Sequence, residues 1–266
     1  MVTCKEYVER KKAKLKADVS EYLLFSPKLC VIQIGDDPAS NSYIKGKRKD
    51  CEEIGIEFEH IHINNYDNFS QYDLECLIWG KNIDERVAGI IVQLPIPDKY
   101  DVKALQNNIF RTKDVDGFRP DSRFTPCTPK GIMDYLEYNK VTLAGKVCTV
   151  IGRSEIVGKP LVNLLIDRGA TVISCNSKTP NIKQFTKNSD IVISAIGKAN
   201  YFTADYFSGN QILIDVGINR DEKGKLCGDI AKEAKEDAWL ATPVPNGVGL
   251  LTRVALVDNV IQACFL

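Results

Sequence analysis

Residues 147–160, VCTVIGRSEIVGKP, combine an apolar strand, a turn with two glycines and the start of a helix. Gly152 permits the tight turn, and Gly158 lets the helix pack closely against the strand. The free N–H groups and the positive dipole of the helix N-terminus suit a pyrophosphate. The spacing is G-x-S-x-x-x-G rather than G-x-G-x-x-G, so this stretch alone leaves a nucleotide site and an ordinary strand–helix turn both open.

Strands and helices alternate on both sides of this turn. Apolar strands are expected at 29–35, 58–63, 87–94, 146–152, 170–176, 190–197 and 211–219, and helices at 3–20, 37–55, 71–82, 102–109, 131–139, from Gly158, near Gln184, and at 250–265. Strands that are apolar almost throughout indicate parallel sheets covered by helices on both faces. Residues 119–131 hold three prolines and are expected to connect two domains.

The predicted fold is therefore α/β, with two domains. Residues 1–125 are expected to form an N-terminal α/β substrate domain with the catalytic residues. Residues 126–249 are expected to form a Rossmann-like NADP-binding domain, and the helix over 250–266 is expected to pack back on the first domain.

The composition is typical of a soluble globular protein, and the cysteine pattern is typical of a cytoplasmic one. Lysine plus arginine (35) equals aspartate plus glutamate (35), so no net field favours nucleic acid or an anionic membrane. No apolar run approaches the roughly 20 residues of a membrane span, and the charged N-terminus argues against a secretory signal. The nine cysteines contain no CxxC pair and are expected to be reduced and mostly buried.

No metal site is expected. His60 and His62 alternate along a strand, but no nearby cysteine or spaced carboxylates complete a set of ligands. Since these are the only two histidines, histidine-based catalytic triads are also not expected.

The strand that follows the glycine turn indicates which dinucleotide would bind. NAD-binding units usually carry an acidic residue at the end of this strand, where it holds the ribose 2′-hydroxyl. Here the strand ends in SCNSKT (174–179), without an acid. Arg153, Ser177 and Lys178 suit a 2′-phosphate instead, which favours NADP, although Lys178 alone is equally consistent with a solvated loop.

The helix over 37–55 places a lysine on its apolar side. At about 100° per residue, Ile44, Cys51 and Ile54 form one stripe; Lys47 lies inside it and Tyr43 borders it. A lysine there must extend its ammonium to solvent, pair with a polar group or face a cavity. Short-chain dehydrogenases also use a tyrosine and a lysine at this spacing, but their glycine-rich loop precedes the pair. Here the loop follows it, so the pair and the cofactor are expected in different domains.

Two further polar residues interrupt apolar segments. Gln93 is expected at the carboxyl end of the strand in GIIVQLPIP, where α/β sheets place their ligands. A buried glutamine needs partners, and both Lys47 and its own loop could supply them. Asp116 lies in the loop KDVDGF, closed by Gly117.

These motifs, in this order, resemble the bifunctional methylenetetrahydrofolate dehydrogenase/methenyltetrahydrofolate cyclohydrolase family. The matching stretches lie between about residue 31 and residue 253 and are GDDPASNSYIKGK, GIIVQLPIP, KDVDGF, PCTPKGI, VIGRSEIVGKP, DVGIN and TPVPNGVG. The resemblance implies a homodimeric enzyme of one-carbon metabolism and purine biosynthesis, with a folate cleft between its domains. It implies NADP-dependent oxidation of 5,10-methylenetetrahydrofolate to 5,10-methenyltetrahydrofolate, and hydrolysis of that product to 10-formyltetrahydrofolate.

The resemblance also assigns residues by motif position. Lys47 is implied as the acid–base catalyst of ring opening, with Gln93 holding its ammonium, Tyr43 orienting it and Asp116 accepting hydrogen bonds from the pterin. The implied cofactor-binding residues are Gly152, Arg153, Ser154, Ser177 and Ile218. The implied substrate-binding residues are Tyr43, Lys47, Val92, Gln93, Leu94, Asp116, Pro245, Asn246, Gly247, Val248 and Gly249.

The sequence departs from the family pattern in three places. The family usually reads PVPGGVGPMT where this chain has PVPNGVGLLT, so Asn246 replaces a glycine and Leu250 a proline; Asn176 stands where histidine is common. Asparagine tolerates positive φ, so the backbone can persist while the side chain narrows the folate pocket. Three alternatives stay open: retention of only one activity, a shikimate-type dehydrogenase, and a non-catalytic NADP-binding module.

Overall fold

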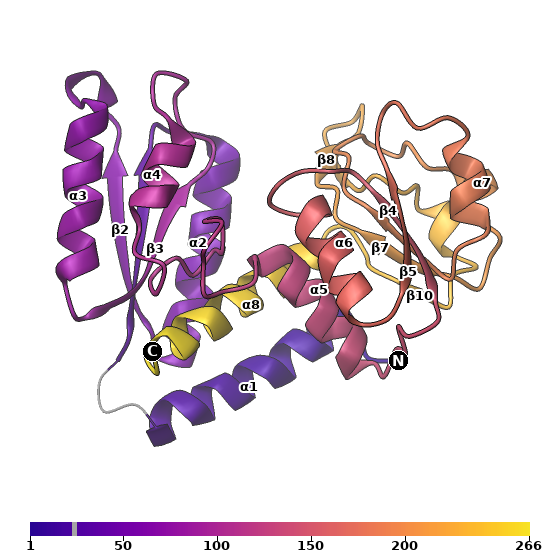
Figure 1. Ribbon diagram of the computed structural model, residues 1–266, viewed down its shortest axis with the longest axis horizontal. Coiled ribbons are helices and arrows are strands. Elements are labelled where there is room, and N and C mark those ends of the chain that lie inside the picture. Colours follow the sequence, from indigo (N-terminus) through magenta and orange to yellow (C-terminus); the bar gives the residue numbers. More distant parts are fainter. Residues whose placement is uncertain (23–25) are drawn as a thin grey trace. The chain divides into compact units, whose positions relative to one another are not determined.

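The computed structural model describes residues 1–22 and 26–266, which form two compact units (Figure 1). The first unit comprises residues 1–9 and 128–252, and the second comprises residues 10–127 and 253–266. The chain passes between them within three helices: α1 (Cys4–Tyr22), α5 (Cys127–Tyr138) and α8 (Val248–Ala263).

The second unit is built on a three-stranded parallel sheet. Its strands are β1 (Lys28–Ile34), β2 (Glu57–Ile63) and β3 (Val87–Gln93), in the order β2-β1-β3. The helices are α2 (Pro38–Ile54), α3 (Gln71–Ile83) and α4 (Val102–Asn108), with a 3-10 turn at Tyr66–Asn68. These elements lie where the sequence pattern predicts them.

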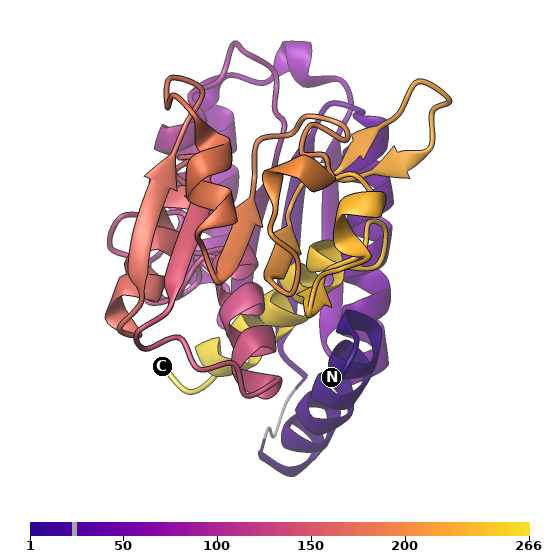
Figure 2. The same ribbon diagram turned by 90° about the vertical axis from the view of Figure 1, so that its right-hand side faces the viewer.

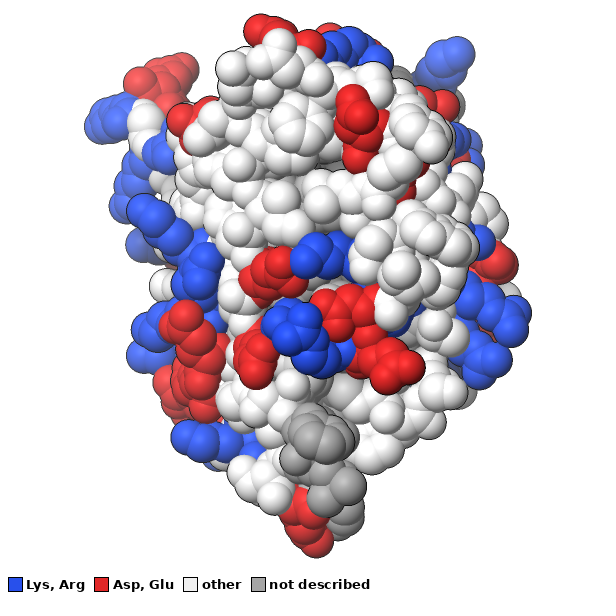
Figure 3. All heavy atoms as spheres, turned by 90° about the vertical axis from the view of Figure 1, so that its left-hand side faces the viewer, with Lys and Arg blue, Asp and Glu red and all other residues white. Residues whose placement is uncertain are grey.

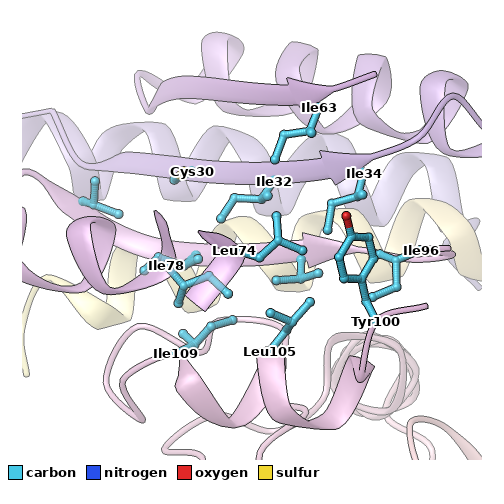
Figure 4. Close-up of a cluster of buried hydrophobic side chains, with 13 residues drawn as sticks. Cys30, Ile32, Ile34, Ile63, Leu74, Ile78, Ile96, Tyr100, Leu105 and Ile109 are labelled. Carbon is cyan, nitrogen blue, oxygen red and sulfur yellow. The ribbon is translucent and has the colours of Figure 1, made fainter. Parts of the chain in front are cut away.

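The two faces of this sheet follow from the alternation of side chains along its strands. Cys30, Ile32 and Ile34 of β1 point to one face and pack with Leu74 of α3 and Leu105 of α4 in a buried cluster (Figure 4). The intervening residues of β1 point to the opposite face. Gln93, at the end of β3, therefore belongs to a different face from its neighbour Val92, which lies in the cluster.

Local capping fixes where α2 begins and ends. The Asp37 carboxylate accepts the N–H of Ser40 at 2.7 Å, and Pro38 occupies the first turn. Gly55 ends the helix in the left-handed conformation, with φ of +98°. The start and the end of the helix that carries Lys47 are therefore fixed by local interactions.

The first unit is built on a five-stranded parallel sheet, in the order β10-β7-β6-β4-β5. Its strands are β4 (Val147–Ile151), β5 (Thr171–Cys175), β6 (Ile191–Ser194), β7 (Ile212–Asp215) and β10 (Leu240–Ala241). The helices α6 (Gly158–Asp167) and α7 (Ile182–Lys187) and two 3-10 turns (Ala204–Tyr206, Glu233–Lys235) complete it with α5.

Several boundaries differ from those expected. The strand expected over 211–219 ends at Asp215, and β8 (Asn219–Arg220) with β9 (Leu226–Cys227) forms an antiparallel hairpin that extends from the body of its unit (Figure 2). The chain leaves the sheet there because the Asp215 carboxylate is buried and accepts the N–H of Gly217, Asp229 and Ile230. Helix α5 begins at Cys127, inside the expected connection, and α8 begins at Val248 rather than at residue 250.

Charge and cysteine placement agree with the composition. On the face shown in Figure 3, basic and acidic side chains lie next to one another, rather than in separate fields. Six of the nine cysteines are buried, as expected, and none of the nine, all of which lie in the described residues, forms a disulfide. Within residues 1–22 and 26–266, no helix is long and apolar enough to cross a membrane, and no group of three or more His, Cys, Asp or Glu could hold a metal ion.

Candidate active site and nucleotide loop

Lys47 lies in the interior of the second unit. The residue is 4% exposed, so its ammonium does not reach solvent along the surface. Its Nζ donates a hydrogen bond to Oε1 of Gln93 at 3.0 Å and lies 5.1 Å from the centroid of the Tyr43 ring. The structure thus brings together three of the four predicted catalytic residues.

The surroundings of Lys47 are buried. Cys51, one turn further along α2, is fully buried, and burial raises the pKa of its thiol to about 12. Gln93 is 9% exposed, and its Nε2 donates to the carbonyl of Leu94 at 2.9 Å, which directs its amide oxygen towards the ammonium. An ammonium held in this way is suited to proton transfer, because it is desolvated and its direction is fixed.

The end of β3 is held by the first turn of α2. The hydroxyl of Ser40 donates to the carbonyl of Leu94 at 3.0 Å, and the Leu94–Pro95 peptide bond is cis. The Val92 side chain is buried in the core cluster against α3, so a ligand would contact the backbone atoms of Val92. Sequence analysis did not identify Ser40 as a site residue. Its position in the first turn of a capped helix is the signal that could have identified it.

The two aspartates of KDVDGF have different surroundings. Asp114 is almost fully buried and accepts the N–H of Arg119 at 2.9 Å; burial raises the pKa of its carboxyl to about 6. Asp116 is half-buried. Gly117 has φ of +73°, and a Cβ there would lie 2.7 Å from the carbonyl oxygen of Phe124, so the loop requires glycine. Asp114 therefore holds the loop that carries Asp116, a role that sequence analysis did not identify.

The glycine turn of the first unit has the shape that its sequence predicts. Gly152 has φ of +116°, and a Cβ there would lie 2.3 Å from the carbonyl oxygen of Ala195. A Cβ on Gly158 would lie 2.1 Å from the carbonyl oxygen of Gly152, so strand and helix approach each other closely. The hydroxyl of Ser154 accepts the N–H groups of Val157 and Gly158 at 3.2 and 3.3 Å. The turn is thus a backbone cradle at a helix N-terminus, which fits a dinucleotide pyrophosphate.

The residues predicted to hold a 2′-phosphate lie beside this turn. The guanidinium of Arg153 donates to the hydroxyl of Ser174 at 3.1 Å and to the Ser174 carbonyl at 2.5 Å. Ser177 and Lys178 are exposed in the loop that follows β5. The guanidinium is thereby fixed at the strand end where NAD-specific units place an acid.

The segment 245–249 belongs to the first unit and lies beside a predicted cofactor residue. Ile218 is 61% exposed, and a Cβ on Gly249 would lie 3.7 Å from its Cδ1. Asn246 has φ of +72°, so the asparagine retains the left-handed backbone, as expected. A Cβ on Gly247 would lie 2.0 Å from the carbonyl oxygen of Pro243. The segment predicted to contact the folate and the residue predicted to contact the cofactor are therefore neighbours within one unit.

Comparison with known families identifies the chain. The catalytic domain of the tetrahydrofolate dehydrogenase/cyclohydrolase family matches residues 2–116, and the NAD(P)-binding domain of the same family matches residues 126–265. The chain belongs to the tetrahydrofolate dehydrogenase/cyclohydrolase family. The resemblance inferred from the motifs is confirmed, and family membership decides against the shikimate-type alternative. The two-domain α/β fold, with parallel sheets and an NAD(P)-binding domain, is likewise confirmed.

Relatives match this chain over nearly its whole length. The bifunctional protein FolD of Bacillus subtilis is 43% identical over 97% of this chain and 95% of its own. The crystal structure of the bifunctional enzyme FolD from Campylobacter jejuni matches with a TM-score of 0.94 and 37% identity, over 98% of this chain and 97% of that one. The Trypanosoma brucei dehydrogenase-cyclohydrolase, crystallised with NADP and an inhibitor, matches with a TM-score of 0.92 and 29% identity, over 100% and 97%.

Proposed function

We propose that this chain oxidises 5,10-methylenetetrahydrofolate with NADP+ and hydrolyses the resulting 5,10-methenyltetrahydrofolate to 10-formyltetrahydrofolate. The observation that carries this proposal is the buried ammonium of Lys47, hydrogen-bonded to Gln93 and set against the Tyr43 ring, in a chain of this family. The folate is proposed to contact Tyr43, Lys47, Gln93 and Asp116 of the second unit. The further proposed folate contacts are Val92, Leu94, Pro245, Asn246, Gly247, Val248 and Gly249.

Hydrolysis requires proton movement in two places. Water adds to the methenyl carbon and loses a proton, and the C–N5 bond then breaks as N5 gains one. A single group that accepts the first proton and returns it to N5 catalyses both steps. Lys47 is suited to this role because Gln93 fixes its direction and bulk water is excluded from it. Asp116 would accept hydrogen bonds from the N–H donors of the pterin and so fix the folate.

Oxidation depends on position rather than on an acid or base. When bound, NADP+ supplies the hydride acceptor. The Gly152 turn and the N-terminus of α6 would hold its pyrophosphate, with Ser154 at the same helix end. Arg153 and Ser177 would hold its 2′-phosphate, and the exposed Ile218 would pack against it. The two glycines support this assignment, because they allow the close approach of strand, turn and helix N-terminus that added Cβ atoms would prevent.

Two separate assays test the activities. Wild-type protein is expected to form NADPH from NADP+ and 5,10-methylenetetrahydrofolate, and to hydrolyse added 5,10-methenyltetrahydrofolate. Because the steps are measured independently, retention of only one activity would be recognised. Folded protein with neither activity would overturn the proposal, and NADP binding without either turnover would support the non-catalytic alternative.

A third assay tests the cofactor assignment. Arg153→Ala is expected to raise KM for NADP+ about tenfold, about 1.4 kcal/mol, while KM for NAD+ changes little. Arg168→Ala is the matched control, because Arg168 follows α6 at its other end, where it pairs with Glu137 at 3.2 Å. Equal changes for NADP+ and NAD+ would remove Arg153 from the 2′-phosphate role.

The family resemblance also supports a homodimer in the cytoplasm with no nucleic-acid partner. Light scattering coupled to gel filtration is expected to give a mass near 59 kDa, twice the 29.7 kDa of one chain. A mass of one chain at micromolar concentration would contradict the dimer.

A further inference from the structure

A buried ion-pair cluster lies on the turn of α2 that follows Lys47. Asp50 is 2% exposed, and each of its carboxylate oxygens faces one cation. Nζ of Lys12 lies 2.6 Å from Oδ1, and Nε of Arg253 lies 2.7 Å from Oδ2, as a close ion pair rather than an aligned hydrogen bond. We name these three residues the Asp50 clasp.

The clasp joins three helices that are distant in sequence. Lys12 is on α1 and Arg253 on α8, and each lies within three residues of the point where its helix enters the second unit, at residues 10 and 253. Next to the clasp, Lys11 of α1 pairs with Asp258 of α8 at 3.2 Å. Asp50 therefore holds α2 to α1 and α8 together.

Gly46 shows how closely Arg253 approaches α2. A Cβ on Gly46 would lie 2.0 Å from Nη1 and 2.9 Å from Cζ of Arg253, so the guanidinium rests on the helix backbone. Gly46 directly precedes Lys47, and Asp50 follows Lys47 by three residues, on neighbouring positions of the helix surface. The contact with Arg253 thus spans the turn that carries Lys47.

A buried carboxylate with two partly buried cations is a costly way to stabilise a helix contact. Desolvation offsets much of the attraction within a buried ion pair, and well-packed apolar residues usually stabilise as much or more. What directional ion pairs add is a single fixed arrangement, because a charge that moves out of place is left buried and unpaired. The turn they fix here is the one that carries Lys47.

We propose that Asp50 is a positioning residue for Lys47. It holds the turn 46–50 of α2 against α1 and α8, and its negative charge pairs with Lys12 and with Arg253. This inference rests on the proposed hydrolysis at Lys47. It assigns a role in that reaction to a residue that does not touch the substrate.

The charge around Lys47 sets the direction of the expected effects. Its own helix carries Tyr43, Asp50, Cys51 and Glu53, which also pairs with Lys12; Gln93 is on β3, Lys12 is on α1 and Arg253 is on α8. Without the Asp50 charge, Arg253 loses its anionic partner while Lys12 keeps Glu53 at 2.8 Å, and the loss of one negative charge on this helix disfavours the protonated form of Lys47. Without the Arg253 charge, one cation is removed and the protonated form is favoured.

Two variants that break the same ion pair are therefore expected to shift the pH profile of hydrolysis in opposite directions. In Asp50→Asn, we expect the pH at half-maximal hydrolase kcat to fall by about half a unit or more, with kcat about tenfold lower. In Arg253→Met, which keeps an unbranched apolar stem, we expect that pH to rise. A merely structural loosening would move both profiles the same way, and that result would overturn the proposal.

A third variant separates geometry from charge. Gly46→Ala removes no charge but displaces the guanidinium of Arg253 from its seat on α2. We expect a lower hydrolase kcat, an unchanged pH profile and an unchanged KM for NADP+. If Asp50→Asn does not fold, Arg253→Met and Gly46→Ala still decide the question. Wild-type kcat and pH profile in both of these would overturn the clasp.

The control is Glu59→Gln, which breaks the ion pair with Lys81 between β2 and α3 of the same unit. It is expected to leave hydrolase kcat and its pH profile unchanged. The hydrolase activity of the wild-type protein distinguishes a failure of the proposed function from a failure of the proposed role of Asp50. Absent wild-type hydrolase activity would overturn the proposed function, whereas active wild type with superimposable variant profiles would overturn the role of Asp50 alone.

Discussion

The two candidate sites of this protein are built from different materials. In the second unit, the Lys47 ammonium is enclosed and bound to Gln93, so that side chains in the interior form the site. In the first unit, the turn at Gly152 and Gly158 is shaped by the absence of side chains, and Ser177 beside it is exposed. A site of the first kind is sensitive to the loss of a functional group, and a site of the second kind to added volume.

The largest expected effect tests the enclosed site. Lys47→Ala removes the proposed proton carrier and is expected to lower hydrolase kcat by roughly 10²–10⁴-fold, the usual contribution of a positioned acid or base. NADP binding is expected to persist, because the glycine turn lies in the other unit. Lys45→Ala, at an exposed position of the same helix, is the matched control. A Lys47→Ala enzyme with full hydrolase activity would remove the residue from catalysis.

The second prediction tests the site built from backbone shape. Gly152→Ala places a Cβ 2.3 Å from the carbonyl oxygen of Ala195, at φ of +116°, so the turn must move. We expect NADPH affinity, measured by titration calorimetry, to fall at least about tenfold, or about 1.4 kcal/mol. Gly145→Ala is the control, since Gly145 has φ of +77° but nothing within 4 Å of an added Cβ. Equal losses in the two variants would assign the effect to backbone strain rather than to the close approach.

The sequence predicts one feature of each of these two sites. The stripe of Ile44, Cys51 and Ile54 predicts that Lys47 lies on the apolar side of its helix, because helical periodicity indicates which face is covered; that its ammonium is buried rather than extended to solvent is shown only by the structure. Glycines at fixed spacing predict the nucleotide turn, because few other residues fit such backbone shapes. Both signals are local, and both agree with the structure.

Contacts between distant segments could not be predicted in this way. The ion pair between Asp50 and Arg253 joins residues that are far apart in the sequence, and no local pattern indicates that these two charges will meet. The strand β10 has only two residues, too few for any periodicity, and gains its place by pairing with β7. Only the assembled fold brings these partners together.

A third prediction concerns Asp114, which supports the loop of Asp116. Burial raises its pKa to about 6 in the folded protein, against 3.8 for an ordinary aspartate. Since the folded state keeps this proton longer, the group makes the free energy of unfolding fall as the pH rises from about 4 to about 6. Asp114→Asn removes the titration, so its stability relative to wild type should rise across this window by about 1–3 kcal/mol.

Urea denaturation at several pH values measures this difference. The control is Asp121→Asn, because hydrogen bonds from Arg119 lower the pKa of Asp121 and reverse the sign. Its contribution is present at neutral pH and is lost as the pH falls through the lowered pKa. Parallel stability curves for Asp114→Asn and wild type would show that Asp114 does not titrate in this window.

The smallest expected effect sharpens the comparison at Asn246, where a side chain replaces the family's glycine in the segment 245–249. With φ of +72°, the backbone already has the conformation that glycine adopts without strain, so Asn246→Gly should change stability by less than about 1 kcal/mol. If the amide narrows the folate pocket, KM for the folate should fall a few-fold while kcat is unchanged, because removing an obstruction improves binding in ground state and transition state alike. Asn210→Gly, also at positive φ in this unit, controls for the backbone effect. An unchanged KM would mean that Asn246 tolerates the folate as well as glycine does, and that this surface, unlike that around Gly152, has room for a side chain.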